Sequence, residues 1–294
     1  MNNKILYKLK SFIKRTLRRV YLKKYIREIN KIRLINSPNS IKIINCIISS
    51  LKNDINKEEY EIIHKIEELR IKLLSNHSEI QIEDFGAVSP DSSRTELEME
   101  NGVFLKKNIS DICLQASKPY FWCLILFKLI REFKSLNALE LGTCLGVSTA
   151  YQASAQKINN NGNITTIEGA KSLAILSKNN LKELNLNNCH VINGRFIDKL
   201  DKILDVSNII DYAFIDGHHD KNATISYFEL LLPYLAKHAI LVFDDINWSD
   251  GMKQAWGNII NNQKIKISIN LKQLGICILD ENLTTKHDFI IPIF

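Results

Sequence analysis

The pattern of apolar and polar residues separates the chain into two parts. From residue 135 onward, short apolar runs of strand length alternate with segments long enough for helices, and these runs are NALELG, NITTIEG, CHVING, DYAFIDG and AILVFDD. Runs this apolar suit strands that are buried on both faces, as in a parallel sheet covered by helices. The stretch KIKISINLKQLGICIL adds two runs with a short break at Lys272 and Gln273, which predicts an antiparallel pair at the end of the sheet.

The part before residue 135 is mainly helical in pattern. Residues 1–35 read as a basic amphipathic helix, and residues 40–75 have apolar residues at helical spacing throughout. Residues 76–108 are polar and rich in Ser, Asp and Glu, which predicts a lid-like loop. Two helices should follow, over ISDICLQAS and YFWCLILFKLIREF. We therefore expect an N-terminal helix (1–35), a helical extension with a lid-like loop (36–107) and an α/β domain (108–294).

Positive charge is concentrated at the N-terminus. Residues 1–35 hold twelve Lys and Arg residues and one acid, Glu28, so they contribute +11 to a net charge of +7 and leave −4 for the rest. The apolar face of this helix consists of Ile5, Leu6, Leu9, Phe12, Ile13, Leu17 and Val20. Such a helix is expected at an anionic membrane surface, but its apolar stripe equally suits packing on its own domain or on the second subunit of a homodimer. The uninterrupted apolar face argues against a nucleic-acid partner.

The cysteines and the most apolar window favour a cytoplasmic protein. No two of the six cysteines have CxxC spacing, so they read as small apolar residues in a reducing compartment. The window YFWCLILFKLI is too short to span a bilayer and contains Lys128. We expect a cytoplasmic protein, with peripheral attachment to the inner face of the membrane left open by the basic helix.

Polar residues and glycines follow each of the five predicted strands. In open parallel sheets, ligands bind beyond the carboxyl ends of the strands. Polar groups near a core are costly unless they have partners, so their repetition at one edge indicates a site. The residues at these ends are Glu140 and Gly142, Glu168 and Gly169, Gly194 and Arg195, Asp216 to His219, and Asp244 and Asp245.

Two of these ends suit a nucleoside. The loop from Gly142 to Gly146 leads into a helix start, where a ligand approaches the backbone and a negative group is favoured. Glu168, at the next strand end, is placed to accept hydrogen bonds from two ribose hydroxyls. The spacing is GxxxG and not the GxGxxG of dinucleotide folds, so a nucleoside without phosphates fits better. An NAD-dependent oxidoreductase and a membrane-attached cofactor-binding protein without turnover stay open as alternatives.

Four motifs together carry a family resemblance. The stretches ALELGTCLGVSTA, TTIEG, FIDGHH and ILVFDDINW resemble the class I S-adenosylmethionine-dependent methyltransferases, above all the catechol-type and related bacterial O-methyltransferases. The similarity covers about residues 108–280. It implies a Rossmann-like, mostly parallel, seven-stranded sheet with an antiparallel last strand. It also implies methyl transfer from S-adenosylmethionine to a hydroxyl of a small-molecule or lipid-like acceptor, although the fold does not distinguish O- from N-methylation.

The resemblance also implies which residues bind the cofactor. They are Glu140, Gly142, Gly146, Ser148, Glu168, Gly169, Gly194, Arg195, Asp216 and His218. Ser148 matches the serine that binds the methionine carboxylate, and Glu168 matches the acid on the ribose. His218 matches the position that packs beside adenine, whereas Arg195, at the adenine edge, is not the usual residue of the family.

Catalytic and metal-binding positions follow from the same resemblance. Asp216, Asp244 and Asp245 match the ligands of a divalent ion, with Asp at the third position where the family has Asn. Three oxygen ligands suit Mg²⁺, but no feature of the sequence fixes its occupancy. The general base of the family is a lysine, and its place is taken by His219, which titrates near neutral pH. Trp248 either walls the acceptor pocket or packs in the core.

Overall fold

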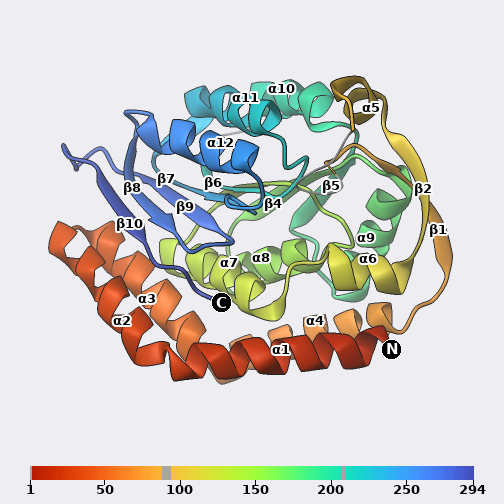
Figure 1. The fold of residues 1–294 in the computed structure, drawn as a ribbon, viewed down its shortest axis with the longest axis horizontal. Helices are drawn as coiled ribbons and strands as arrows, with labels where there is room; N and C mark the ends of the chain where they lie inside the picture. The colour runs from red at the N-terminus through yellow and green to blue at the C-terminus, as the bar shows by residue number, and fades with distance from the viewer. Residues whose placement is uncertain (1, 88–93, 207–208) are drawn as a thin grey trace.

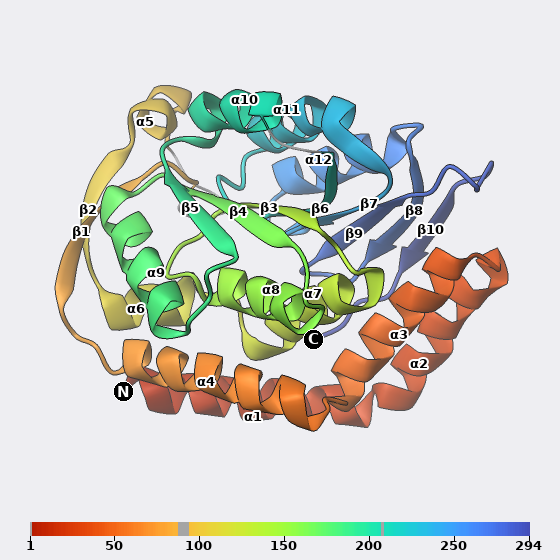
Figure 2. The same cartoon turned by 180° about the vertical axis from the view of Figure 1, so that it is seen from behind.

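A computed structural model describes residues 2–87, 94–206 and 209–294. A mixed eight-stranded sheet crosses the middle of the molecule and has helices on both faces, while the N-terminal helices run along one side (Figures 1 and 2). Residues 88–93, in the predicted lid-like loop, lie outside the described residues. Within the described ranges, no helix combines the length and apolar character needed to cross a bilayer.

The sheet has eight strands in the order β10-β8-β9-β7-β6-β3-β4-β5. They are β3 (Asn137–Leu141), β4 (Asn163–Glu168), β5 (Cys189–Asn193), β6 (Ile210–Ile215), β7 (Leu235–Phe243), β8 (Ile265–Asn270), β9 (Gly275–Leu279) and β10 (His287–Ile290). Strand β9 runs antiparallel to both β7 and β8, and the other neighbours are parallel. The predicted fold class is confirmed, and β10 adds an eighth strand at the β8 edge.

Helices cover the two faces of this sheet in separate groups. One face packs against α7 (Tyr120–Phe133), α8 (Val147–Ile158) and α9 (Lys171–Glu183). The other packs against α10 (Phe196–Val206), α11 (Lys221–Leu231) and α12 (Asp250–Asn261), with the short 3₁₀ turn η2 (Leu232–Tyr234) before β7. Alternate strand residues serve the two faces, as in β3, where Ala138 joins the first core and Leu139 the second.

The N-terminal part forms a series of helices. They are α1 (Asn3–Val20), α2 (Leu22–Asn30), the 3₁₀ helix η1 (Lys31–Ile35), α3 (Pro38–Lys52) and α4 (Lys57–Leu74). Ser37 and Asn56 begin α3 and α4 with capping boxes, and Asn53 ends α3 in the left-handed conformation. The helical stretch predicted over residues 40–75 is therefore interrupted at residues 53–56.

These helices share one core with the α/β domain. Tyr25, Ile29 and Ile43 belong to the same buried cluster as Phe127 and Ile267. The boundary expected at residue 107 therefore does not separate two hydrophobic cores.

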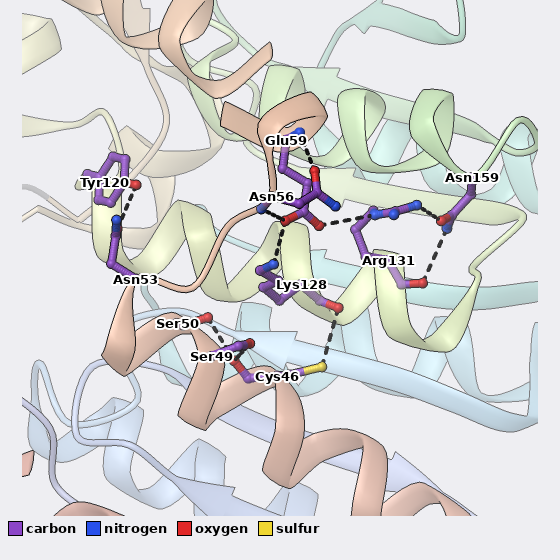
Figure 3. Close-up of polar contacts among 10 residues, drawn as sticks. All are labelled: Cys46, Ser49, Ser50, Asn53, Asn56, Glu59, Tyr120, Lys128, Arg131 and Asn159. Atoms are coloured by element: carbon purple, nitrogen blue, oxygen red, sulfur yellow. Dashed lines mark hydrogen bonds and ion pairs between the residues drawn. The ribbon is translucent and has the colours of Figure 1, made fainter. Parts of the chain in front are cut away.

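A buried ionic contact joins the N-terminal helices to α7. Glu59 of α4 is 4% exposed and accepts hydrogen bonds from Lys128 Nζ at 2.7 Å and Arg131 Nε at 3.4 Å, both on α7 (Figure 3). The same carboxylate completes the capping box with Asn56. Glu59 thus both starts α4 and fixes it to the helix that covers the sheet.

The prediction of a loop over residues 76–108 is wrong for much of that segment. Strands β1 (Glu79–Asp84) and β2 (Val103–Asn108) form an antiparallel pair, with α5 (Glu96–Asn101) before β2 and α6 (Ile109–Gln115) after it. Ser172 Oγ, on α9, donates to the carbonyl of Gln81 at 2.6 Å. The hairpin is therefore attached to the helix that follows β4, beside the carboxyl edge of the sheet.

Candidate active site

A cavity of about 810 Å³ lies at the carboxyl ends of β3, β4, β6 and β7. Residues 82–87, from the β1–β2 hairpin, also line it. Its size and position are those of a small-molecule site in an open α/β sheet. The predicted residues that line it are Gly142, Ser148, Glu168, Gly169, Arg195, Asp216, His218, His219, Asp244, Asp245 and Trp248.

Three residues predicted to bind the cofactor do not line this cavity: Glu140, Gly146 and Gly194. Glu140 is fully buried and accepts hydrogen bonds from Thr149, from Gln152 Nε2 at 2.7 Å and from Thr166 Oγ1 at 2.8 Å. Its oxygens are thus engaged by α8 and β4, behind the strand end. The expectation that Glu140 lines the pocket does not match this position, which is that of a structural carboxylate joining β3 to its neighbours.

Gly142 and Gly146 shape the loop after β3. Gly142 has φ +107°, and an added Cβ would lie 1.9 Å from the carbonyl oxygen of Asp216. Gly146 has φ +78° and is the N-cap of α8. Both positions need glycine for backbone reasons, and Gly142 in particular allows the ends of β3 and β6 to approach closely. Ser148 lies in the first turn of α8, where a helix N-terminus favours a negative group.

Glu168 is held at the end of β4 by two backbone amides. Cys144 N donates to Oε2 at 2.7 Å, and Ala170 N donates to Oε1 at 2.9 Å. Each oxygen keeps a second lone pair for a ligand hydroxyl. Burial raises the pKa of Glu168 to about 7, against the opposing effect of these two amide donors.

The two histidines after β6 have different surroundings. His218 Nδ1 lies 2.9 Å from Tyr227 Oη, and its carbonyl accepts from Ala87 N at 2.9 Å. His219 Nε2 lies 3.9 Å from Asp216 Oδ1, and its ring centroid is 5.7 Å from that of Trp248. Burial lowers the pKa of both imidazoles. Of the two positions predicted for Trp248, the structure shows the one on the cavity wall, beside His219, and not the one in the core.

Strained backbone accompanies these side chains. His218, His219 and Asp245 all have positive φ, at +69°, +49° and +51°, as does Cys144 at +49°. Non-glycine residues seldom adopt this conformation, and it tends to occur where the surrounding structure fixes a functional geometry. Four such residues lie at the ends of three adjacent strands.

A buried lysine lies among the acids. Lys118 precedes α7 and is 6% exposed. Its Nζ is 3.5 Å from Asp216 Oδ1 and also forms an ion pair with Asp244. Burial raises the pKa of Asp216 and, together with the charge of Asp216, raises that of Asp244 to about 7. Burial disfavours the ammonium of Lys118, but Asp216 and Asp244 outweigh this effect and raise its pKa.

This arrangement does not fit the three-carboxylate Mg²⁺ site implied by the resemblance. Among the described residues, the ligand atoms that lie within 4.8 Å of one another belong to Asp216, His219 and Asp244, and Asp245 is not among them. Within the part of the chain that the structure describes, the buried Oδ1 of Asp244 has no hydrogen-bond partner. Its other oxygen, Oδ2, accepts a hydrogen bond from Lys118 Nζ. An ammonium group already supplies positive charge at the position expected for the ion.

The cavity as a whole is acidic. Its lining includes seven carboxylic acids (Glu83, Asp84, Glu168, Asp216, Asp220, Asp244 and Asp245) against three basic residues (Lys107, Lys118 and Arg195). Arg195 is in addition paired with Asp198, through Nε–Oδ2 at 2.7 Å and Nη2–Oδ1 at 2.9 Å. An excess of acids favours a cationic ligand over one that carries phosphates.

Comparisons with known proteins agree with this geometry. A family model described as a methyltransferase domain matches residues 139–246, the segment that contains β3 to β7 and the strand ends described above. Residues 139–246 form a methyltransferase domain. The resemblance to class I methyltransferases is thereby confirmed.

Solved methyltransferase structures share the fold. The O-methyltransferase of Bacillus cereus, in complex with SAH, is 21% identical over 56% of this chain and 84% of its own, with a TM-score of 0.50. The SAH-bound methyltransferase PaMTH1 of Podospora anserina is 13% identical over 57% of this chain and 82% of its own, also with a TM-score of 0.50. At these identities the likeness concerns the fold.

A sequence relative is known from a virus. The uncharacterized protein R132 of Acanthamoeba polyphaga mimivirus is 31% identical over 136 residues. The match covers 44% of this chain and 61% of the viral protein, which is less than two thirds of its length.

Two parts of the cavity lining come from outside the methyltransferase domain, and the motifs of that domain do not predict them. Lys118 comes from the segment between α6 and α7, and residues 82–87 come from the β1–β2 hairpin. Both precede residue 139, outside the segment that matches the family model. The local signal for Lys118 is its position two residues before the largely apolar helix α7. Phe85, in residues 82–87, lines the cavity, but no pattern in the sequence around it predicts this position.

Proposed function

We propose that the methyltransferase domain transfers a methyl group from S-adenosylmethionine to an oxygen of a small-molecule or lipid-like acceptor. The observation that carries this proposal is the acidic cavity at the strand ends, which suits a sulfonium nucleoside. Glu168 would accept hydrogen bonds from the ribose, and the α8 N-terminus with Ser148 would face the methionine carboxylate. The SAH bound to the relatives of similar fold supports the choice of cofactor.

The same cavity argues against the main alternative. An NAD-dependent oxidoreductase would need to hold a pyrophosphate that carries two negative charges. Seven acids and three basic residues line the cavity, and the glycine spacing after β3 lacks the dinucleotide fingerprint. A nucleoside with a positive sulfur and no phosphate matches this balance better.

His219 is proposed as the general base. It lines the cavity beside Asp216 and Trp248. The ammonium of Lys118, the other basic group described against Asp216 and Asp244, is already paired with both carboxylates. The cofactor supplies an electrophilic methyl group on a positively charged sulfur. His219 would take the proton of the acceptor hydroxyl as that oxygen forms its bond to the methyl carbon. The electrons of the broken carbon–sulfur bond remain on sulfur, which becomes a neutral thioether.

Lys118 is proposed to supply the positive charge that a divalent ion supplies in the catechol-type enzymes. One ammonium facing Asp216 and Asp244 leaves the cluster negative, which favours the sulfonium, and holds both carboxylates in place. A divalent ion at Asp216 and Asp244 would have to displace this ammonium.

Two measurements test the function. Native mass spectrometry of the purified protein should detect retained S-adenosylhomocysteine, and calorimetry should show one site for this nucleoside and none for NADH. Radiolabelled methyl transfer to phenolic, sugar and lipid hydroxyl acceptors should then yield an O-methyl product. Binding of NADH without S-adenosylhomocysteine would exclude the proposal. Nucleoside binding without any methylated product would indicate a cofactor-binding protein, and a product labelled on nitrogen would correct the acceptor atom.

A further inference from the structure

Helix α1 packs on the protein through its polar face and exposes its apolar face. None of its residues is buried, whereas the next helix, α2, buries Tyr25 and Ile29 in the common core. At 100° per residue, the apolar side chains of α1 cover an arc of about 140°. Those that are exposed are Ile5, Leu9, Phe12, Ile13, Leu17 and Val20, with exposed fractions from 38% for Leu17 to 69% for Val20.

Specific polar contacts fix this orientation. Asn3 Nδ2 donates to Asp111 Oδ1 at 2.6 Å, and Tyr7 Oη donates to Glu67 Oε2 at 3.3 Å. Near the other end of the helix, Arg18 Nη1 donates to the carbonyl of Phe294 at 2.7 Å. The Arg18 guanidinium also lies 4.1 Å from the centroid of the Phe121 ring. These contacts hold α1 near both of its ends, and its apolar face therefore points away from the molecule.

The exposed face is bordered by positive charge. Lys8, Arg15 and Arg19 lie along one edge and Lys10 along the other, and α1 contains no acidic residue. Lys23, Lys24 and Arg27 of α2 are exposed as well. Figure 1 shows α1 along the lower edge of the molecule and α2 at its lower left, with the sheet above α1. An apolar strip of six side chains that is exposed to water marks an interaction site.

The charge distribution identifies the partner. A second copy of the chain would bring the seven basic residues of one α1 against those of another, because a symmetric dimer uses the same patch on both subunits. An anionic lipid surface instead offers hydrocarbon to the apolar strip and phosphate charge to the basic border at the same time.

We propose that α1 lies in the plane of an anionic membrane surface, with Leu9, Phe12 and Ile13 inserted below the headgroups and the basic border at the phosphates. This binding concerns a surface away from the cavity residues and does not depend on the proposed reaction. It would place the methyltransferase domain at a membrane, where lipid-like acceptors are concentrated.

Substitutions test this better than a deletion would. Removing residues 1–35 would take Tyr25, Ile29 and Ile32 out of the core and so damage the fold. The triple variant Leu9→Ser, Phe12→Ser and Ile13→Ser changes side chains that are 48%, 68% and 49% exposed. A matched control replaces the same three residue types elsewhere, Leu136→Ser, Phe104→Ser and Ile175→Ser, which are 44%, 64% and 52% exposed.

The measurement is co-sedimentation of the full chain with vesicles of phosphatidylcholine containing about one third phosphatidylglycerol. We expect the α1 variant to partition at least tenfold more weakly than the wild type, and the control variant to stay within twofold. Wild-type binding should also fall at least tenfold when the salt concentration is raised to 0.5 M, and on pure phosphatidylcholine. Unchanged melting temperatures establish that both variants fold.

Three outcomes would overturn the proposal. One is the absence of wild-type binding to the anionic vesicles. Another is equal partitioning of the α1 variant and the control. The third is a stable wild-type dimer, seen by light scattering in the absence of lipid, that the α1 substitutions dissociate, because the strip would then be a subunit interface.

Discussion

Lys118 Nζ lies 3.5 Å from Asp216 Oδ1 and contacts Asp244 as well, so one ammonium joins the ends of β6 and β7. Removing it as Lys118→Ala would leave buried carboxylates without a counter-charge. We expect a loss of about 3–5 kcal/mol in the free energy of unfolding, measured by urea denaturation. Lys107→Ala, which also changes a basic residue of the cavity lining, should cost much less because the structure gives Lys107 no ion pair among the described residues.

The same lysine allows a test of metal dependence. If Lys118 supplies the cluster's positive charge, wild-type turnover should survive exhaustive chelation. Added Mg²⁺ should raise the melting temperature of Lys118→Ala by several degrees and leave the wild type unchanged, because only the variant has room for the ion. Loss of wild-type turnover on chelation, restored by Mg²⁺, would instead assign the carboxylates to a metal.

Cofactor affinity should depend on pH through Glu168. Burial raises the pKa of this group to about 7, so the free protein holds a proton there at mildly acidic pH. Ribose hydroxyls donate to the carboxylate form, and binding therefore releases that proton. The affinity for S-adenosylhomocysteine should rise with pH up to about 7 and then level off, as measured by calorimetry. Glu168→Gln should bind more weakly and without this dependence, and an identical pH profile would remove Glu168 from the site.

The raised pKa of Glu168 also affects stability, with the opposite sign. A carboxyl group whose pKa is higher in the folded than in the unfolded state stabilises the fold at pH values below the unfolded pKa. This contribution is lost as the pH rises through about 7. The wild-type protein without cofactor should therefore lose about 1–3 kcal/mol relative to Glu168→Gln between pH 4.5 and pH 8, by urea denaturation. If the difference in free energy of unfolding between the wild type and Glu168→Gln did not change with pH, the raised pKa would not belong to Glu168.

His219→Gln tests the proposed base. The substitution keeps a polar side chain beside Asp216 but cannot take a proton from the acceptor. Turnover with the best hydroxyl acceptor should fall by about 10²–10⁴, while affinity for S-adenosylhomocysteine holds. His190→Gln, on the exposed side of β5, is the control and should leave both unchanged. An unchanged rate in His219→Gln would exclude His219 from proton transfer.

The sequence predicts the inner parallel strands β3, β4, β6 and β7 well because most of their residues are buried, which gives each a largely apolar run. Strand β10, by contrast, has the sequence HDFI and alternates between half-buried and exposed residues at the edge of the sheet. Strand β1 is similar, with only Ile82 buried in EIQIED. Such short polar strands are stabilised by their neighbours, and their own composition does not distinguish them from loops.

The site shows the same division between local and distant determinants. Glu168 and Asp216 follow apolar runs directly, so their place at the edge of the sheet is readable from the chain. Lys118 reaches Asp244 across 126 residues, and only the packing of α7 against the sheet brings them together. Glu140 is the second-last residue of β3, and Glu168 is the last residue of β4. Unlike Glu168, Glu140 has its oxygens engaged by Thr149, Gln152 and Thr166, away from the cavity. Side-chain direction at a strand end is thus decided by the partners that surround it.

Glu59→Gln tests how the N-terminal helices are attached. The substitution keeps the shape of the side chain and removes the charge that Lys128 and Arg131 share, as drawn in Figure 3. We expect a loss of about 2–4 kcal/mol in the free energy of unfolding. Glu58→Gln, one residue earlier in the same helical turn but exposed, should cost less than about 0.5 kcal/mol. Equal effects would show that the buried contact adds nothing beyond helix capping.

Gly142→Ala tests the close approach of β3 and β6. An alanine Cβ would lie 1.9 Å from the carbonyl oxygen of Asp216, and the backbone φ of +107° is unfavourable for any L side chain. The ends of the two strands must then separate, which should lower the melting temperature and weaken S-adenosylhomocysteine binding at least tenfold. Gly257→Ala is the control, since a Cβ there meets nothing within 4 Å in the interior of α12, and it should stabilise the protein by about 0.5–1 kcal/mol. If Gly142→Ala bound the nucleoside as tightly as Gly257→Ala, the loop after β3 would not form part of the cofactor site.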